Sequence, residues 1–279
     1  MNDHYRLYRD HALNIRKNIL EMVNTAGSGH VGGSLSIVEI LTALYFSEMK
    51  VDTNNPAWED RDRLVLSKGH ASPALYSVLS EKGFFPQELL KGFRNINSPL
   101  SGHAEMHVSG VDMSTGSLGQ GLSIAVGMAL AGKTMGKSYR VYCVIGDGEL
   151  EEGQNWEAAM CAAHYHLDNL VAIIDNNGLQ IDGPITEIMS SYPIDKKFES
   201  FNWNVINVDG HDYDQLLQAF HDAREKKNYP TILVAKTIKG KGVSFMENNV
   251  AWHGKAPNNE EYSKAMSELS GVEHGCCNE

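Results

Sequence analysis

The chain alternates short, almost wholly apolar runs with longer segments in which apolar residues recur every three or four positions. The short runs have the length of β-strands and span residues 63–67, 141–146, 170–175, 205–208 and 231–235. The periodic segments have helical spacing and span residues 5–25, 36–48, 71–82, 119–131, 154–165 and 212–226. Apolar strands separated by helices are typical of a mainly parallel sheet with helices on both faces. The pattern therefore predicts an α/β fold.

The organisation along the chain is simple. We find neither an internal repeat nor a low-complexity segment, and we interpret residues 1–279 as a single domain. Regular structure is expected to be sparse between residues 83 and 116, and a long irregular segment in a compact domain is usually functional. The polar end, from about residue 268 to 279, is expected to be a flexible tail.

Composition and charge narrow the class of partner. The chain has 24 lysines and arginines against 35 aspartates and glutamates, and its net charge of −11 argues against general affinity for nucleic acid or an anionic membrane. Any phosphate must then be held locally, by a metal ion, histidines or helix N-termini. The sequence has no apolar run long enough to span a membrane and no signal segment, so a cytoplasmic location is expected.

The 4 cysteines are too few for a disulfide framework in a chain of this size. Cys143 lies in an apolar run and Cys161 in a periodic segment, so both are expected to be small core residues. Cys276 and Cys277 fall in the polar tail, and nothing in the pattern indicates a zinc site.

A two-part motif carries the strongest chemical signal. Gly146-Asp147-Gly148 ends one apolar run, and Asn176-Asn177 ends the next. The carboxyl ends of parallel strands meet at one edge of a sheet, which is where such folds bind ligands. A carboxylate, an amide oxygen and the backbone carbonyl of Leu179 are hard ligands that suit Mg²⁺ holding phosphates. The plain alternative is two ordinary turns, since these residue types favour turns anyway.

Further motifs accompany this pair along the chain. They are Ser67-Lys68-Gly69-His70, the segment Ser-Gly-His-Ala-Glu at 101–105, and two glycine-containing segments at 114–121 and 146–153. Together the motifs resemble the N-terminal, diphosphate-binding domain of transketolase, over about residues 10 to 255. The resemblance implies a thiamine diphosphate-binding fold, thiamine diphosphate as cofactor, and Mg²⁺, for which Ca²⁺ or Mn²⁺ can substitute. It assigns Asp147, Asn177 and Leu179 to the metal.

Four of the 12 histidines sit in glycine-flanked loops. The resemblance implies that His70 and His253 contact the cofactor diphosphate. It places His30 and His103 toward the substrate, where imidazoles bind hydroxyls and move protons, and His253 serves both sites. The remaining histidines are interpreted as ordinary residues: His4, His11, His107, His164, His166, His211, His221 and His274.

The resemblance assigns further residues near the cofactor. Gly116 and Leu118 would lie against its rings, and Gly148 and Asn177 beside its diphosphate, although a tight turn packing a small-residue helix would also explain the first pair. The acidic run 149–152 would ordinarily be a solvated helix start. Within it, Glu152 matches a catalytic position between active sites. Lys239 and Lys241 are either surface charges or residues that close over a phosphate, and the sequence does not distinguish these two roles.

The resemblance also implies a missing half. In transketolases a second domain, from another polypeptide, supplies the glutamate that activates the cofactor, and this sequence has no counterpart of it. We therefore expect the N-terminal subunit of a split transketolase, which moves a two-carbon ketol unit from a ketose phosphate to an aldose phosphate. Its partner would be a C-terminal subunit with the pyrimidine-binding and C-terminal domains, in a heterotetramer. A shortened piece of a longer chain is the alternative.

Three rival functions remain open. A 1-deoxyxylulose-5-phosphate synthase and the alpha subunit of a 2-oxo-acid dehydrogenase are disfavoured by the segments 101–105 and 149–153, although Asp-Gly-His-Asp at 209–212 also occurs in the synthase. A non-catalytic cofactor-binding subunit is disfavoured by the intact motif residues. Ala104 replaces a frequent proline and Val31 also departs from the family pattern, so an unusual ketose or a branched sugar phosphate is a possible substrate.

Overall fold

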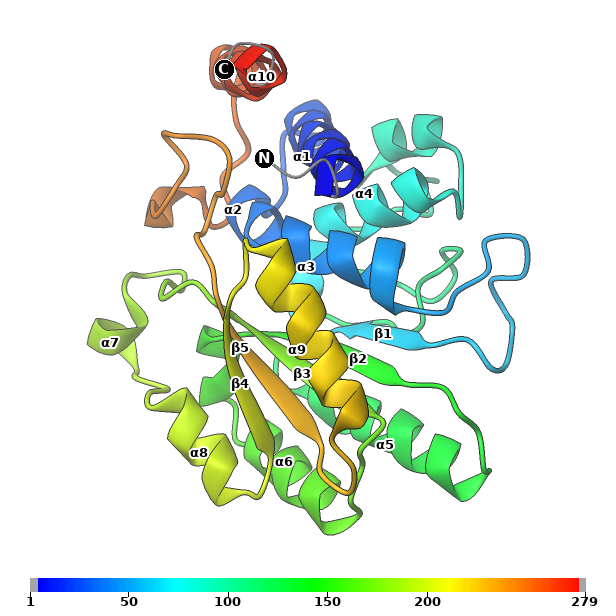
Figure 1. Cartoon of the computed structure of the whole chain (residues 1–279). Helices are drawn as coiled ribbons and strands as arrows, with labels where there is room; N and C mark the ends of the chain where they lie inside the picture. The colour runs from blue at the N-terminus through cyan, green and yellow to red at the C-terminus, as the bar shows by residue number, and fades with distance from the viewer. Residues whose placement is uncertain (1–4, 276–279) are drawn as a thin grey trace.

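A computed structural model describes residues 5–275 of the chain (Figure 1). Its centre is a five-stranded sheet in the order β1-β2-β3-β5-β4, and every neighbouring pair of strands is parallel. The strands are β1 (Arg63–Leu66), β2 (Val141–Gly146), β3 (Leu170–Asn176), β4 (Asn204–Asp209) and β5 (Thr231–Lys236). The predicted α/β fold with a parallel sheet is confirmed.

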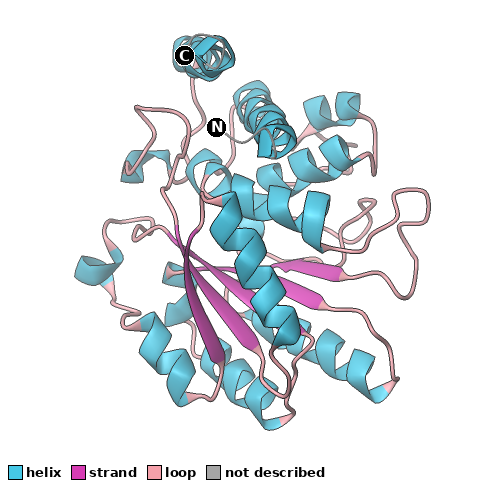
Figure 2. Ribbon diagram, in the orientation of Figure 1, coloured by secondary structure: helices cyan, strands magenta, loops and turns pink. Residues whose placement is uncertain are grey.

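Helices cover both faces of the sheet, as Figure 2 shows. One side of the sheet carries α1 (Arg6–Ala26), α2 (Val31–Leu35), α3 (Val38–Ala43), α4 (Ser72–Lys82) and α9 (Tyr213–Glu225). On this side α10 (Asn259–Gly275) packs against α1, away from the sheet. The other is covered by α5 (Gln120–Thr134), α6 (Gln154–His164) and α8 (Ile194–Ser200), with the short α7 (Ile185–Ile188) at the edge. A hydrophobic core lies on each face of the sheet, and alternate strand residues pack into the two cores. Tyr142 and Val144 belong to the first core, and Cys143 and Ile145 to the second. Two-sided burial explains why β1, β2, β3 and β5 are largely apolar, whereas the edge strand β4 is only partly buried and carries polar residues.

The predicted helix over residues 36–48 begins earlier and is interrupted. Here α2 starts at Val31, directly after His30, and α3 continues into a π-helical turn, Leu44–Glu48. Glycines at 32 and 33 have low helix propensity, which is why the sequence pattern missed this first turn. By contrast, α1 ends as predicted, with Gly27 at φ 61° in the left-handed conformation that glycine adopts easily.

The helix α10 continues to Gly275 and so overlaps the segment from about residue 268 that was expected to be a flexible tail; the flexibility of that end stays a prediction. Ala265 and Leu269, four residues apart, are buried against the first core. The Glu268 carboxylate accepts hydrogen bonds from the backbone and hydroxyl of Ser244, at 2.7 and 2.9 Å. These contacts anchor the helix. The predicted tail cysteines, Cys276 and Cys277, lie outside the described residues.

Two other expectations concern simple properties of the chain. Cys143 is fully buried, as predicted, whereas Cys161 is half-buried on α6. Between residues 5 and 275, none of the helices combines the length and the apolar character needed to cross a bilayer.

The carboxyl ends of the strands form the edge of the sheet where a ligand crevice is expected. The register sets Gly146 opposite Asp175 and Asn176 opposite Lys236, so the ends of β2, β3 and β5 are level. The segment after β1 leads to α4 on one face, whereas β2 leads to α6 on the other. Adjacent connections that leave in opposite directions create a crevice at this edge.

A buried charged cluster joins α1, α3 and the turn before α9 on the first face. Arg16 of α1 donates to Glu39 of α3 at 2.5 Å, and His211, just before α9, bonds the other Glu39 oxygen at 2.9 Å. Burial alone would raise the pKa of Glu39, but the Arg16 guanidinium and the His211 bond more than offset this effect and lower the pKa to about 2. We name Arg16, Glu39 and His211 the Glu39 cluster.

The lowered pKa of Glu39 predicts a specific acid sensitivity. The folded-state pKa lies below the unfolded one, so the stabilisation is complete above about pH 5 and is lost as the pH falls toward 2. We expect Glu39→Gln to lower the free energy of unfolding by about 3 kcal/mol at neutral pH. Urea unfolding at several pH values should show this gap closing between about pH 5 and pH 2. A gap that does not change with pH would contradict the assignment.

Candidate functional site

The two-part motif comes together at the carboxyl edge of the sheet. Asp147 is 2% exposed, and its two oxygens accept hydrogen bonds from the backbone of Gly148 at 2.9 Å and of Gly178 at 2.6 Å. Asn177 Oδ1 accepts from the backbone of Leu179 at 3.1 Å. The loop after β3 is therefore folded onto Asp147, which brings the predicted metal ligands together from two adjacent loops, those after β2 and β3.

Asp175, at the end of β3, is the centre of the buried polar network beneath this loop. Its carboxylate accepts from Ser36 Oγ at 2.7 Å, Thr237 Oγ1 at 2.5 Å and Asn177 Nδ2 at 3.1 Å. It also pairs with the Lys68 ammonium, which donates to the Gly33 carbonyl at 2.9 Å. Asp175 thus joins four chain segments and orients the Asn177 amide.

Lys239 is a site residue that sequence reasoning left undecided. Its side chain is 2% exposed, and its Nζ donates to the Leu179 carbonyl at 3.0 Å and lies 2.9 Å from His253 Nδ1. Lys241, by contrast, is half-buried and pairs with Glu247 at 3.4 Å. The glycine that follows each lysine was the available signal, but it does not distinguish the two.

Three of the four predicted histidines form one cluster. The ring centroids of His30 and His70 are 5.0 Å apart, and His253 lies 5.5 Å from each of them. His30 Nδ1 is buried without a hydrogen-bond partner in the structure. A buried, unpaired imidazole nitrogen beside two further rings fits a ligand that supplies the missing hydrogen bonds.

The electrostatics of this cluster favour neutral imidazoles next to ammonium groups. Burial first, then nearby cations, lowers the pKa of His30 to about 4 and that of His253 to about 3. Burial and the Lys68 charge lower the pKa of Lys239 to about 8. Positive charge is thus concentrated at the carboxyl edge of a chain whose net charge is −11. A local anion would be attracted there.

The fourth histidine, His103, lies over the turn before α5. A Cβ atom on Gly116, whose φ is +150°, would approach the His103 ring to 3.0 Å. Both residues line an open cavity of about 520 Å³ together with Glu105, Ser114, Thr115, Ser117, Gln120 and Ile124. Leu118 is 37% exposed beside it, and the Glu152 side chain lies under Gly119. Leu118 of this turn and Glu152 of the segment after β2 are thus both exposed beside the cavity.

Glu149 corrects the prediction of a solvated acidic run. Glu151 and Glu152 are exposed, but Glu149 is 3% exposed, and burial raises its pKa. Its carboxylate accepts from the Ser67 hydroxyl, from the backbone of Gly119 at 2.9 Å and from that of Gly146 at 3.0 Å. Glu149 thereby connects β1, the turn before α5 and the end of β2.

Truncation of Glu149 is expected to be strongly destabilising. Glu149→Ala leaves three buried donors without an acceptor, so the free energy of unfolding should fall by about 3 kcal/mol or more. Denaturant unfolding measures this loss. The neighbouring Glu151→Ala is the matched control, since Glu151 is exposed, and it should change stability by less than about 0.5 kcal/mol. Equal losses for the two variants would contradict the role of Glu149.

Val31 and Ala104, which depart from the family pattern, do not line the site. Both side chains are fully buried in the first core, so neither faces a substrate directly. They can influence His30 and His103 only through the backbone they share.

The residues present fit a metal-bound diphosphate. Burial and the nearby Asp175 charge raise the pKa of Asp147 to about 7, a cost that a bound cation would relieve. Within the described residues, no group of three or more His, Cys, Asp and Glu side chains could hold a metal. The predicted donors are instead one carboxylate, an amide oxygen and a carbonyl oxygen, a set that would suit Mg²⁺. A Cβ on Gly33 would lie 3.3 Å from Lys68 Nζ and 3.7 Å from His70 Nε2, in the space an anion would use.

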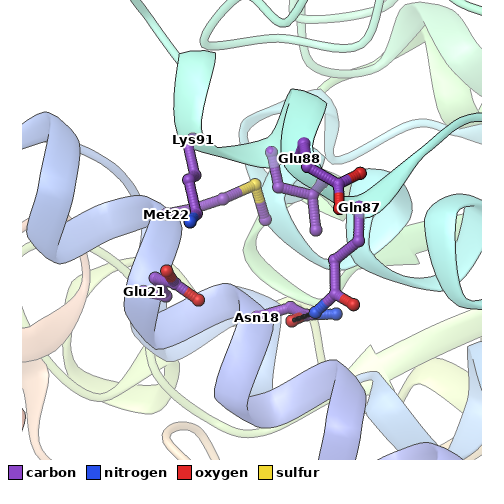
Figure 3. Close-up of a pocket in the computed structure, with 7 residues that line it drawn as sticks. Asn18, Glu21, Met22, Gln87, Glu88 and Lys91 are labelled. Atoms are coloured by element: carbon purple, nitrogen blue, oxygen red, sulfur yellow. Dashed lines mark hydrogen bonds between the residues drawn. The ribbon is translucent and has the colours of Figure 1, made fainter.

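A separate pocket of about 240 Å³ lies between α1 and the turn 87–92 (Figure 3). Asn18 at its base accepts from Gln87 Nε2 at 2.7 Å, and none of the predicted site residues lines it. This pocket is distinct from the carboxyl-edge site.

Comparisons with known proteins agree with the site. A family model described as the transketolase, thiamine diphosphate binding domain matches residues 8–274. The 6-deoxy-6-sulfo-D-fructose transketolase subunit SqwG of Clostridium sp. (strain MSTE9) is 48% identical over 91% of this chain and 93% of its own length. An apulose-4-phosphate transketolase subunit from Phocaeicola vulgatus is 43% identical over 91% of each chain.

Solved structures give the same assignment. Transketolase from Campylobacter jejuni superposes with a TM-score of 0.90 at 34% identity, covering 97% of this chain and 43% of that one. The chain thus spans less than half of that solved chain. These matches favour transketolase over the synthase and dehydrogenase alternatives. The chain therefore belongs to the transketolase family and corresponds to its thiamine diphosphate-binding domain.

Proposed function

We propose that this chain is the N-terminal subunit of a two-component transketolase that transfers a two-carbon ketol unit from a ketose phosphate to an aldose phosphate. The observation that carries the proposal is the meeting of Asp147 and its loop with three histidine rings and two buried lysines at one sheet edge. The names of the two relatives of similar length, both called subunits, support the need for a partner.

The metal and diphosphate would be held by residues of the loops after β2 and β3. Asp147, the Asn177 amide oxygen and the Leu179 carbonyl would bind Mg²⁺, with Ca²⁺ or Mn²⁺ as substitutes. Gly148 would bring its backbone against the diphosphate. When bound, thiamine diphosphate supplies a carbon nucleophile and an electron sink for cleaving the bond next to the ketose carbonyl.

The remaining site residues have separate tasks in this proposal. His70, His253 and Lys239 would donate hydrogen bonds to diphosphate oxygens. The turn at Gly116 and Leu118 would pack against the cofactor rings.

The substrate would approach from the side of His30 and His103. The two imidazoles would bind sugar hydroxyls and move a proton at the carbonyl oxygen. Glu152 would lie at the boundary with the partner subunit, which contributes the pyrimidine-binding domain and its activating glutamate. The expected assembly is a cytoplasmic heterotetramer with two copies of each chain.

Reconstitution tests the proposal. The chain is mixed with a candidate C-terminal subunit, thiamine diphosphate and Mg²⁺, and product formation is measured with ketose phosphate donors and aldose phosphate acceptors. The panel includes 6-deoxy-6-sulfo-D-fructose and apulose 4-phosphate, because the relatives carry those names. We expect activity only with both chains present. Cofactor binding without turnover of any donor would favour the non-catalytic alternative, and activity of this chain alone would contradict the need for a partner.

A further inference from the structure

We propose that the Glu39 cluster positions the turn Ile238–Lys241 and thereby aims Lys239 into the site. The inference rests on the proposed function, in which Lys239 binds the cofactor diphosphate. Arg16, Glu39 and His211 do not touch the site themselves, and the sequence had suggested an ordinary role for His211. They would therefore be positioning residues rather than catalytic ones.

The cluster holds the turn on both sides of Lys239. The backbone amide of Ile238 donates to His211 Nε2 at 2.9 Å, and the Lys241 carbonyl accepts from Arg16 Nε at 3.1 Å. Between them, Gly240 donates to the Gly32 carbonyl at 3.0 Å. Three backbone groups around Lys239, the Ile238 and Gly240 amides and the Lys241 carbonyl, thus have their partners in the Glu39 cluster or at the start of α2. The Ile238 and Gly240 carbonyls instead accept from Lys241 and Val243 within the turn region.

The hydrogen bonds form one directional chain. Because the Ile238 amide donates to His211 Nε2, that nitrogen carries the lone pair and the ring proton lies on Nδ1. Nδ1 then donates to Glu39 at 2.9 Å, and the other Glu39 oxygen accepts from Arg16 at 2.5 Å. Arg16 and Glu39 are 7% and 8% exposed, so water offers little replacement for these bonds.

The conformation of the turn depends on this packing. Gly242 has φ +96°, and a Cβ there would lie 2.7 Å from Arg16 Nε. Gly240 has φ +80°, and a Cβ there would lie 2.3 Å from the Met246 carbonyl oxygen. With the turn fixed in this shape, the Lys239 side chain extends through buried surroundings toward Leu179 and His253. The long, flexible lysine would otherwise favour solvent.

A second acidic residue provides a matched comparison. Glu48 ends the π-helical turn after α3 and pairs with Arg224 in the last turn of α9. It also accepts from the Tyr142 hydroxyl at 2.7 Å. The Glu48 pair and the Glu39 cluster therefore join the same two segments of chain, but only the Glu39 cluster is bonded to the turn that carries Lys239.

The first experiment measures the solvent exposure of Lys239 and of the Ile238 amide, and it needs no cofactor. Acylation of Lys239 by an N-hydroxysuccinimide ester is followed by mass spectrometry, with buried Lys68 as the internal reference, alongside hydrogen exchange of the Ile238 amide. Glu39→Gln and His211→Phe should raise Lys239 labelling about tenfold relative to Lys68 and speed Ile238 exchange. Glu48→Gln should do neither. His211→Gln, which keeps one donor and one acceptor, should restore much of the protection.

The second experiment measures affinity for thiamine diphosphate with Mg²⁺ by calorimetry. The two cluster variants should bind roughly 10- to 100-fold more weakly than Glu48→Gln. Binding equal to that of Glu48→Gln, with Lys239 labelling also equal, would overturn the inference. Absence of binding by the native chain would instead count against the proposed function, and the labelling result would still decide the positioning role. If Glu39→Gln does not fold, the half-buried His211 and its two variants give the same comparison.

Discussion

Replacing Asp147 with asparagine is expected to abolish Mg²⁺-dependent binding of thiamine diphosphate while leaving the sheet folded. The Asp147 carboxylate is the one charged group in the proposed metal ligand set, the other donors being the Asn177 amide and the Leu179 carbonyl. Loss of a supporting residue around a metal typically costs 10- to 100-fold in affinity, so loss of the charged ligand should cost at least about 100-fold. Turnover by the two-subunit enzyme should fall in parallel.

Asp62 provides a control for this substitution. It is 3% exposed and accepts backbone hydrogen bonds from Lys50 at 2.8 Å and Arg140 at 2.7 Å, much as Asp147 accepts from Gly148 and Gly178. However, it lies before β1, at the opposite edge of the sheet. Asp62→Asn should therefore lower stability by a similar amount without changing cofactor affinity. Calorimetry and denaturant unfolding of both variants test this. Equal affinity for the two variants would exclude Asp147 as a ligand.

Sequence periodicity predicted the fold well because both faces of the sheet are covered. Tyr142 and Cys143 point to opposite cores, and both are buried, so an apolar run signals the strand regardless of register. The end of the chain was harder to predict. Ala265 and Leu269 are a single helical repeat of buried residues within a polar segment, and only packing against α1 makes them core.

The meeting of the candidate residues at one sheet edge was predictable where chemistry is encoded in residue type and order, as with Asp147 and the glycine-flanked histidines. Residues whose role depends on burial were not predictable from the sequence. A lysine or glutamate is usually exposed, so the sequence could not show that Lys68, Lys239 and Glu149 are buried. Each is buried because acceptors or donors from distant segments meet it, and those segments become neighbours only when the sheet forms.

Removal of Lys68 is the second large effect that we expect. Lys68→Met leaves the fully buried Asp175 carboxylate without its ammonium partner, and should lower the free energy of unfolding by about 3–5 kcal/mol. Adding Asp175→Asn removes the unpaired charge, so the double variant should recover most of that loss. A double-mutant cycle by urea unfolding measures the coupling. A double variant that loses the sum of the two single effects would contradict this explanation.

The same pair separates stability from the positioning of Asn177. In the native chain, Asn177 Nδ2 donates to the Asp175 carboxylate at 3.1 Å. In Lys68→Met with Asp175→Asn, an amide oxygen remains at position 175 to accept this bond. In Lys68→Met with Asp175→Leu that acceptor is absent, and the Asn177 amide is free to turn away from a metal. We expect the leucine variant to bind thiamine diphosphate with Mg²⁺ roughly 10- to 100-fold more weakly than the asparagine variant. Calorimetry on the two double variants, which share the loss of Lys68, measures the difference. Equal affinities would mean that Asp175 serves only to neutralise Lys68, and that Asn177 is oriented by its bond to Leu179 alone.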